Sequence, residues 1–314
     1  MQHIERNMNN AIRYFKALSD ETRLRLVCVL QKYELSVNEL VSLLEMGQSR
    51  VSRHLKILTE AGLLSSRRDG LWVFYSAVTD GEGADFLRSV APFLSSGIVR
   101  ADVLMAAQII EERALKTRQF FNTIAEHWDT LSREVLGGFD LAGAVCEAIP
   151  ADCAVAVDLG CGTGIVLERM CGRAREIIGV DGSPRMLELS RRRLAGMDGD
   201  EPVSLRIGDL SHLPLRDEEA DFASINMVLH HISEPETVLS EIRRTLRPGG
   251  QLLVADFDQH DQERMRVEYG DLWLGFNEVT MRRFLQSTGF EVASCIRHPV
   301  EQGLALNLTL ARRI

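Results

Sequence analysis

The sequence predicts an α/β protein in two parts: a small N-terminal domain of helices with one β-hairpin, and a C-terminal domain built on a mostly parallel, seven-stranded sheet. The chain has 314 residues, which is too long for one small core and suits two domains. Apolar residues follow a helical spacing in most of the first part, whereas from Asp152 short β-prone runs alternate with helical segments. That alternation is typical of a parallel α/β sheet.

Composition and charge narrow the classes of protein further. The chain is 45% hydrophobic and 26% charged, which indicates an ordinary globular protein. Residues 1–117 carry 15 basic and 14 acidic side chains, whereas residues 118–314 carry 21 and 31, so we expect any nucleic-acid contact in the first part. The start, MQHIERNMNN, has no apolar signal-peptide core and no stretch suits a membrane helix. We therefore expect a cytoplasmic protein with no membrane partner.

The N-terminal domain should contain four helices followed by a hairpin, and local signals mark three of these helices. Asp20 can cap the first helix, and Ser36 with Glu39 forms a capping box for the second. A third helix is expected over residues 48–61, because its apolar residues are spaced four and three apart. The hairpin should run from Leu64 to Tyr75, with Asp69-Gly70 as its turn.

The outer face of the third helix is polar and basic, which favours DNA binding. Helix-turn-helix proteins place the N-terminal part of such a helix in the major groove, where Arg and Gln can read bases. Arginines on the hairpin suit phosphates or a minor groove. The predicted DNA contacts are Gln48, Ser49, Arg50, Ser52, Arg53 and Lys56 on the helix and Arg67 and Arg68 on the hairpin. The competing interpretation is a helical bundle whose solvated face is basic, but the hairpin directly after the helix favours the winged helix-turn-helix form.

The segments FKALSDETRLRLVCVL and SVNELVSLLEMGQSRVSRHLKILTEAGLL, followed by the hairpin, resemble the ArsR/SmtB family of winged-helix regulators over about residues 8–78. The resemblance implies a homodimer that reads a two-fold double-stranded DNA operator. Many members sense metals, yet Ser36 and Asn38 stand where arsenic-sensing members carry cysteines. The later helix also lacks the paired Asp and His of zinc-sensing members. With six scattered cysteines and no CxxC pair, we expect no metal.

A helix-prone segment over residues 83–126 should connect the two parts, with a break near Pro92, Ser95, Ser96 and Gly97. Its apolar stripe can pack on its own domain or on a twin helix of a second chain. The members of the stripe are Val103, Leu104, Ala107, Ile110, Ala114 and Leu115. The predicted domains are residues 1–95, a connecting and dimerisation helix over 96–120, and residues 121–314.

A glycine-rich turn with two downstream acids predicts a nucleotide-type pocket in the C-terminal domain. The run VDLGCGTG follows a β-prone segment and precedes a helix. Its glycines allow a tight turn and close approach of a ligand. Asp181 ends the next strand, where it can accept ribose hydroxyl protons, and Asp209 follows the strand after that. A dinucleotide-binding domain is the competitor, but it needs a glycine at position 165, which is Ile165.

This region, about residues 120–314, resembles class I S-adenosylmethionine-dependent methyltransferases of Rossmann-like fold. The resemblance implies S-adenosylmethionine or S-adenosylhomocysteine as ligand. Phe120, Phe121 and Trp128 resemble the aromatic helix that covers the ligand, and Leu246-Arg247-Pro248-Gly249-Gly250 resembles the turn before the fifth strand. The implied binding residues are Asp158, Gly160, Gly162, Gly164, Asp181, Gly182, Met186, Asp209, Leu210, Asn226, Met227, His231 and Trp128.

Three functions remain open at this stage. The first is a transcriptional regulator, a repressor, that senses one of the two adenosyl compounds, as do the S-adenosylhomocysteine-responsive regulators of the methionine cycle that the whole architecture resembles. The second is an active methyltransferase on a small molecule with an autoregulatory DNA-binding head. The third is a DNA-tethered methyltransferase of protein or nucleic acid. His230 and His231 are the candidate catalytic bases, and the competing interpretation is that they only shape the pocket.

Overall fold

The computed structural model describes residues 2–94, 97–195 and 203–314, with side chains from residue 8 onward. It divides into two compact units, Met1–Arg113 and Ala114–Ile314. The break expected at Ser95 and Ser96 lies outside the described residues. No single described helix is both long and apolar enough to cross a membrane; one bent pair, Gly81–Phe93 with Gly97–Leu136, passes that test on length and composition alone.

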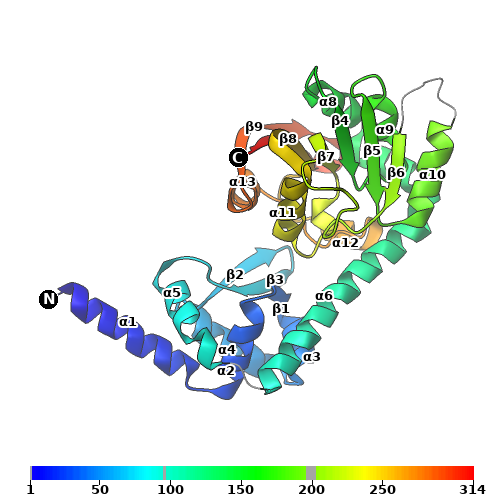
Figure 1. Cartoon of the computed structure of the whole chain (residues 1–314). Coiled ribbons are helices and arrows are strands. Elements are labelled where there is room, and N and C mark those ends of the chain that lie inside the picture. The colour runs from blue at the N-terminus through cyan, green and yellow to red at the C-terminus, as the bar shows by residue number, and fades with distance from the viewer. Residues whose placement is uncertain (1, 95–96, 196–202) are drawn as a thin grey trace. The chain divides into compact units, whose positions relative to one another are not determined.

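The first unit consists of helices around a small antiparallel sheet (Figure 1). Asp20 caps α2 through a 3.1 Å hydrogen bond from the Arg23 N–H, and Ser36 and Glu39 form the expected capping box at α3. Both local predictions are confirmed. The sheet order is β1-β3-β2, and both of its pairings are antiparallel. The elements are α1 Gln2–Leu18, α2 Glu21–Leu30, β1 Leu35–Ser36, α3 Val37–Leu44, α4 Gln48–Glu60, β2 Leu64–Asp69, β3 Trp72–Ala77, α5 Gly81–Val90, the 3-10 turn η1 Ala91–Phe93 and the start of α6 Gly97–Ile124.

The hairpin turn falls one residue later than the sequence predicted. Asp69 pairs with Trp72, so Gly70 and Leu71 form the two-residue loop. Gly70 takes a left-handed φ of 56°, which glycine adopts at little cost. Asp69 stays in the strand because it is buried and forms a 2.8 Å ion pair with Arg67.

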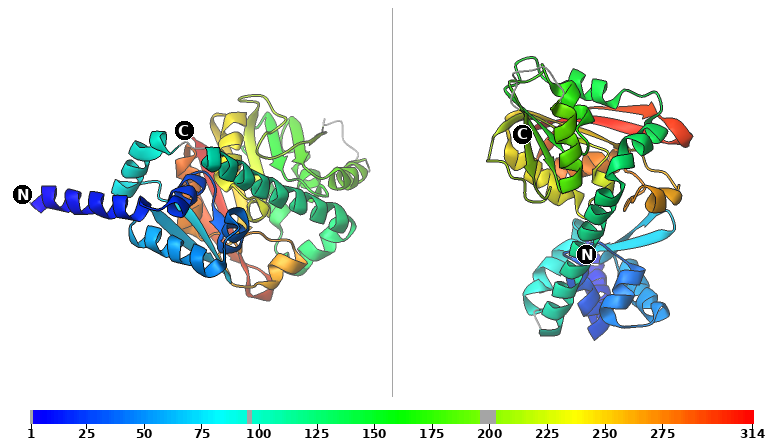
Figure 2. Two further views of the ribbon diagram at one scale, coloured as in Figure 1. Left: turned by 90° about the horizontal axis from the view of Figure 1, so that it is seen from below. Right: turned by 90° about the vertical axis from the view of Figure 1, so that its right-hand side faces the viewer.

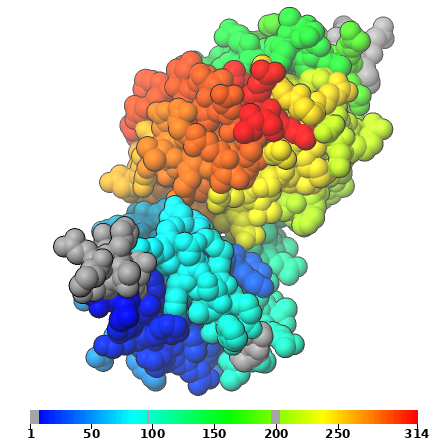
Figure 3. Space-filling view, turned by 60° about the vertical axis from the view of Figure 1, so that its left-hand side comes forward, coloured from blue at the N-terminus to red at the C-terminus, as the bar shows by residue number. Residues whose placement is uncertain are grey.

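Helix α6 divides its apolar stripe between the core and the surface. Val103 and Ile110 pack against the core of the first unit, whereas Leu104 is 67% and Leu115 is 50% exposed. Asp102 fixes the same helix to α2 through two hydrogen bonds from Arg25, 2.7 and 2.8 Å long. Figure 3 shows the surface of this unit where α1, in dark blue, meets α5, in cyan.

The second unit has the expected mixed sheet of seven strands, in the order β6-β5-β4-β7-β8-β10-β9. The first five strands are mutually parallel. Helix α10 lies against β5 and β6, and α11 against β8 (Figure 1). The elements are η2 Ala125–His127, α7 Trp128–Leu136, α8 Leu141–Ala148, β4 Val155–Leu159, α9 Ile165–Met170, β5 Glu176–Asp181, α10 Pro184–Leu194, β6 Val203–Ile207, β7 Ala220–Asn226, η3 Leu229–His231, α11 Pro235–Thr245, β8 Leu246–Phe257, α12 Arg264–Glu268, α13 Glu278–Ser287, β9 Phe290–Pro299, η4 Glu301–Gly303 and β10 Ala305–Arg313.

The last two strands pair antiparallel, as expected, but only β9 is an edge strand. β10 lies between β8 and β9 and pairs with both. In Figure 2 these orange and red strands lie at the opposite end of the sheet from the green β5. β10 runs antiparallel to both of its neighbours. The local sequence pattern alone could not predict which of the two last strands lies at the edge of the sheet.

The central strand β4 is where the chain order along the sheet reverses, with β5 on one side and β7 on the other. Such a reversal leaves a crevice beyond the carboxyl ends of the strands, where parallel α/β sheets bind ligands. The predicted loop directly follows β4, and Asp181 and Asn226 are the last residues of β5 and β7. The architecture therefore gathers the predicted ligand residues at one edge of the sheet.

Candidate functional site

The three loop glycines have left-handed backbone conformations, with φ of 70° at Gly160, 52° at Gly162 and 83° at Gly164. A Cβ at Gly160 would lie 2.5 Å from Val228, and one at Gly164 would lie 2.4 Å from the Ser190 hydroxyl. Gly162 differs, because its Cβ would meet nothing nearer than the Trp128 indole nitrogen at 3.8 Å. Gly160 and Gly164 are thus required by packing, whereas the half-buried Gly162 has space for a Cβ on its free side.

Asp158 braces the base of the loop against the neighbouring strand. It is buried, and its Oδ1 accepts hydrogen bonds from the Ser224 hydroxyl at 2.8 Å and the Asn226 amide at 2.9 Å. Burial raises the pKa of Asp158 to about 7, although the two hydrogen bonds oppose the shift. The Oδ1 atom of Asn226 is buried and has no hydrogen-bond partner among the described residues. Asn226 therefore offers an acceptor directly at the carboxyl end of β7.

The Asp181 carboxylate binds the backbone of the glycine loop and of the residue that precedes α10. One carboxylate oxygen accepts the Gly162 N–H at 2.9 Å and the other accepts the Ser183 N–H at 2.8 Å. Burial raises the pKa of Asp181 despite these bonds. Gly182 follows at the strand end, and Ser183 then caps α10 through a 3.1 Å bond from the N–H of the buried Met186.

Asp209 lies at the outer end of this crevice. Its side chain is 47% exposed and lies 3.5 Å from the Arg118 guanidinium, and it accepts the Ser211 N–H at 2.8 Å. Leu210 beside it is buried. Arg118 comes from the end of α6, and sequence reasoning missed it because no local pattern links it to Asp209.

A second missed group clamps the glycine loop from outside. Thr163 donates a 2.5 Å hydrogen bond to Asp129 on α7. Arg193 on α10 donates to the Thr163 carbonyl at 2.8 Å and also pairs with Asp129. These contacts join residues 30 and 34 positions apart in sequence, so only the fold reveals them.

An aromatic path links the predicted covering helix to the histidines. The Phe120 and Phe121 rings lie 5.5 Å apart, Phe121 lies 5.2 Å from Trp128, and Phe121 lies 4.7 Å from the His231 ring. Met227 follows β7 with φ of 57°, a conformation that non-glycine residues rarely adopt. The strain places Met227 in a pocket with Trp128 and His231.

This pocket lies beyond β7 and contains both candidate histidines. Its lining is mainly apolar: Trp128, Ser132, Val135, Leu136, Met227, His230, His231, Phe257, Met265, Tyr269 and Asp271. The His230 Nδ1 atom lies 2.7 Å from Asp256, and the His231 Nδ1 atom lies 3.1 Å from the Gly270 carbonyl. Burial lowers the pKa of His230, but the charges of Asp256 and Asp271 outweigh burial and raise this pKa above its ordinary value. Burial and the neighbouring His230 hold the pKa of His231 well below its ordinary value.

In the first unit, the predicted reading face of α4 is open to solvent. Gln48, Ser49, Arg50, Arg53 and Lys56 are exposed, and Ser52 is half-buried. Gly47 precedes α4 without a side-chain cap, which leaves N–H groups of the first turn for an outside acceptor.

The two hairpin arginines differ in a way that the sequence did not predict. Arg67 makes ion pairs with Glu34 at 3.1 Å and with Asp69 at 2.8 Å. Its guanidinium also lies over the Phe74 ring, 5.4 Å from the centroid. Arg68 is exposed and donates to the Gly70 carbonyl at 3.0 Å. The structure therefore favours Arg68 over Arg67 as the hairpin contact to a phosphate.

Comparison with known proteins assigns the same two regions. Residues 20–66 match the family described as "Bacterial regulatory protein, arsR family", and residues 157–254 match the family described as "Methyltransferase domain". A 37.1 kDa protein in transposon TN4556 of Streptomyces fradiae is 37% identical over 120 residues, 37% of this chain and 33% of that protein. A demethylmenaquinone methyltransferase of Lactobacillus johnsonii is 34% identical over 107 residues, 33% of this chain and 44% of that enzyme. The chain thus spans less than half the length of either relative.

The fold itself recurs among solved structures. A Burkholderia thailandensis 1,6-didemethyltoxoflavin-N1-methyltransferase, solved with S-adenosylhomocysteine bound, is 23% identical and has a TM-score of 0.51. That match covers 65% of this chain and 89% of the other. The chain thus combines a region that matches the bacterial arsR family with a domain of the methyltransferase fold.

Proposed function

We propose that this protein is a DNA-binding transcriptional regulator, a repressor, whose C-terminal domain binds and senses S-adenosylhomocysteine or S-adenosylmethionine. The observation that carries the proposal is the uncrowded Gly162, which is hydrogen-bonded to Asp181, together with the unsatisfied Asn226 Oδ1 atom, in a chain that also has an exposed, basic α4. The first feature suits an adenosyl ligand and the second suits double-stranded DNA. In this proposal residues 1–95 bind DNA, residues 96–120 form the connecting and dimerisation helix, and residues 121–314 bind the adenosyl ligand.

The residues present fit the ligand at both of its ends. Asp181 would accept ribose hydroxyl protons, exchanging backbone donors for ligand donors, and Asp209 would accept from the adenine amino group. Asn226 Oδ1 would accept from the ammonium group of the methionine end, where it gains the partner it lacks. Bound S-adenosylmethionine carries an electrophilic methyl group that its demethylated product lacks. The two compounds also differ by one charge, so a pocket can distinguish them.

The head would read DNA as a homodimer, with α4 of each copy in a major groove. Exposed Leu104 and Phe93, 67% and 86% exposed, are candidates for the surface between copies. Regulation requires that the adenosyl ligand favour one conformation of the dimer over another.

The test is an operator-shift titration of full-length protein on a genomic DNA fragment selected by the protein itself. We expect one adenosyl compound to change the DNA affinity and the other to act more weakly. Asp181→Ala should lose the ligand response and keep ligand-free DNA binding. Arg53→Ala should weaken DNA binding by about 1–3 kcal/mol and keep ligand binding. If neither compound changes the DNA affinity, the sensor proposal is wrong.

The second candidate is an active methyltransferase on a small molecule, with the head controlling its own operon. It is favoured by the largely apolar lining of the small pocket beside Met227 and His231, close to the predicted methionine end of the ligand. The Nε2 atom of His231 is buried without a hydrogen-bond partner among the described residues, so it could accept a proton from a substrate. Transfer of labelled methyl groups to a metabolite panel, including quinols, would favour this function. Transfer to protein or nucleic acid would favour the third.

A further inference from the structure

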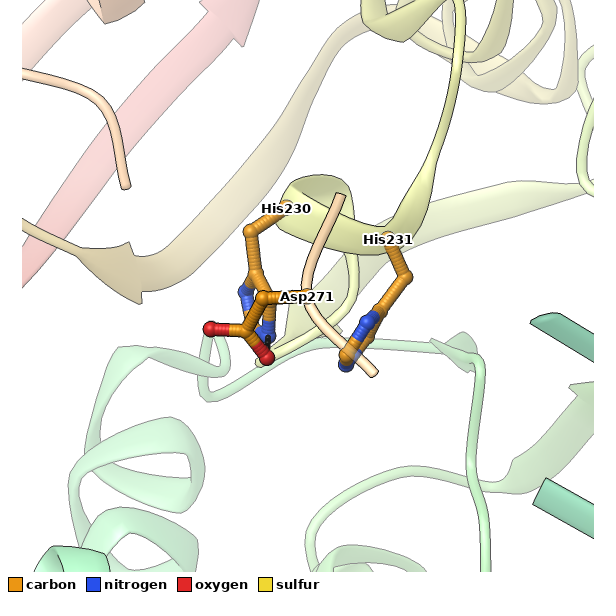
Figure 4. A group of neighbouring side chains, drawn as sticks. All are labelled: His230, His231 and Asp271. Atoms are coloured by element: carbon orange, nitrogen blue, oxygen red, sulfur yellow. Dashed lines mark ion pairs between the residues drawn. The ribbon is translucent and has the colours of Figure 1, made fainter. Parts of the chain in front are cut away.

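Three metal-ligating side chains meet at the pocket, and two of them, His230 and Asp271, have no role in the proposed adenosyl site. His230 and His231 come from η3, and Asp271 comes from the segment between α12 and α13 (Figure 4). One donor atom of each lies within 4.8 Å of the other two. All three residues are buried, with at most 4% of their surface exposed. Such a group is costly to bury unless its polar atoms are satisfied.

Both imidazoles are oriented by a second contact, in the manner of metal-binding histidines. The Gly270 carbonyl at 3.1 Å can only accept, so the His231 Nδ1 atom carries the proton and Nε2 bears the lone pair. Asp256, 2.7 Å from the His230 Nδ1 atom, acts on the other imidazole in the same way. The Nε2 atom of His231 is buried and has no hydrogen-bond partner in the described parts of the chain. A cation is one partner that would satisfy it.

The spacing of the donors suits a shared ion better than a direct hydrogen bond. The His230 Nε2 and Asp271 Oδ1 atoms lie 3.6 Å apart, which is too long for a hydrogen bond. Two ligands about 2.1 Å from one tetrahedral zinc ion lie roughly 3.4 Å apart. The donor atom of His231 lies within 4.8 Å of both.

We propose that His230, His231 and Asp271 bind a divalent transition-metal ion of the zinc class. Two imidazole nitrogens and one carboxylate oxygen supply three ligands, which leaves a fourth position for water or a ligand oxygen. That position faces the pocket, since the three residues line it with Ser132 and Tyr269. The sequence prediction of no metal relied on the missing ligands of the helix-turn-helix part and on the scattered cysteines without a CxxC pair, whereas this group consists of His and Asp in the other unit.

Cobalt(II) is a suitable probe, because its visible absorption reports the number and type of ligands. Full-length protein, stripped with a chelator, would be titrated with Co²⁺ and then with competing Zn²⁺. We expect one ion per chain, visible bands of a four-coordinate site and no thiolate charge-transfer band. X-ray absorption of the zinc form should show nitrogen and oxygen neighbours at about 2.0–2.2 Å.

Matched variants assign the site. His231→Leu and Asp271→Asn should each weaken Co²⁺ binding more than 100-fold, and Asp256→Asn, which removes only an orienting contact, should weaken it about 10–100-fold. His298→Leu, at a histidine on edge strand β9, should bind as the parent does. Circular dichroism and urea unfolding check that each variant is folded. The proposal is overturned if folded parent protein binds no Co²⁺, if His231→Leu binds it equally well, or if sulfur appears among the ligands.

Discussion

Alanine at Gly160 and at Gly162 would place the same methyl group in two different surroundings only two residues apart. At Gly160 the new Cβ would lie 2.5 Å from the Val228 side chain, whereas at Gly162 its nearest neighbour would be 3.8 Å away. Both positions have positive φ, as does Gly172, where a Cβ meets nothing within 4 Å. Gly172→Ala therefore measures the backbone strain alone, outside the loop.

The magnitudes follow from these environments. A left-handed alanine costs about 1–2 kcal/mol, which is the expected loss of unfolding free energy in Gly172→Ala and Gly162→Ala. Overpacking adds about 1–3 kcal/mol at Gly160, because the new Cβ would lie 2.5 and 3.1 Å from the two γ carbons of Val228. Gly160→Ala should therefore lose about 2–5 kcal/mol in all.

Ligand binding should separate Gly162→Ala from Gly172→Ala, although the two variants lose the same unfolding free energy. Gly162→Ala should weaken S-adenosylhomocysteine binding at least about tenfold, or roughly 1.4 kcal/mol, because its methyl group occupies the ligand's approach. Gly172→Ala should bind normally. Urea unfolding and isothermal calorimetry measure the two effects separately. Parent-like ligand affinity in Gly162→Ala, or equal stability of Gly160→Ala and Gly172→Ala, would contradict these roles of the two glycines.

Three further predictions concern buried charge and DNA. Because the pKa of Asp158 is raised to about 7, its contribution to the unfolding free energy is complete below pH ~4 and is lost as the pH rises through about 7. In urea unfolding, Asp158→Asn should remove up to about 1.4 kcal/mol per pH unit from the pH dependence of the unfolding free energy. An unchanged pH dependence would contradict this prediction. Asp102→Asn breaks the buried pair with Arg25 and should cost about 3 kcal/mol, against under about 1 for Asp85→Asn in its exposed pair; equal costs in thermal unfolding would count against this. Arg68→Ala should reduce the salt dependence of DNA binding by about one charge, whereas Arg67→Ala should mainly lower stability; the reverse result would restore Arg67 as the phosphate contact.

Local features of the fold were predictable because their signals lie within a few residues. The capping box of Ser36 and Glu39 and the strand Glu176–Asp181 follow from such patterns, and both were confirmed. The hairpin turn was misplaced by one residue, because Asp69-Gly70 suits a turn equally well until Arg67 draws Asp69 into the strand. The interior place of β10 depends on pairing with β8 about 50 residues earlier, which no local pattern encodes.

The candidate site was only partly visible in sequence for the same reason. The glycines and the strand-end acids could be identified by their spacing, and their placement at one sheet edge follows from the parallel topology. The Arg193–Asp129–Thr163 clamp, the Arg118 partner of Asp209 and the carboxylates around His230 come from distant segments. These groups are brought together only by the tertiary fold, so they could not be identified from one sequence.

Helix α6 makes one side-chain contact in each unit that bears on a proposed function. Arg113 of α6 donates to Glu39, the residue that completes the capping box of α3. Five residues further along the same unbroken helix, Arg118 pairs with Asp209, the acid assigned to adenine. An adenosyl ligand that binds as proposed would compete with Arg118 for Asp209, and it would thereby replace an ion pair at the end of α6 within the second unit.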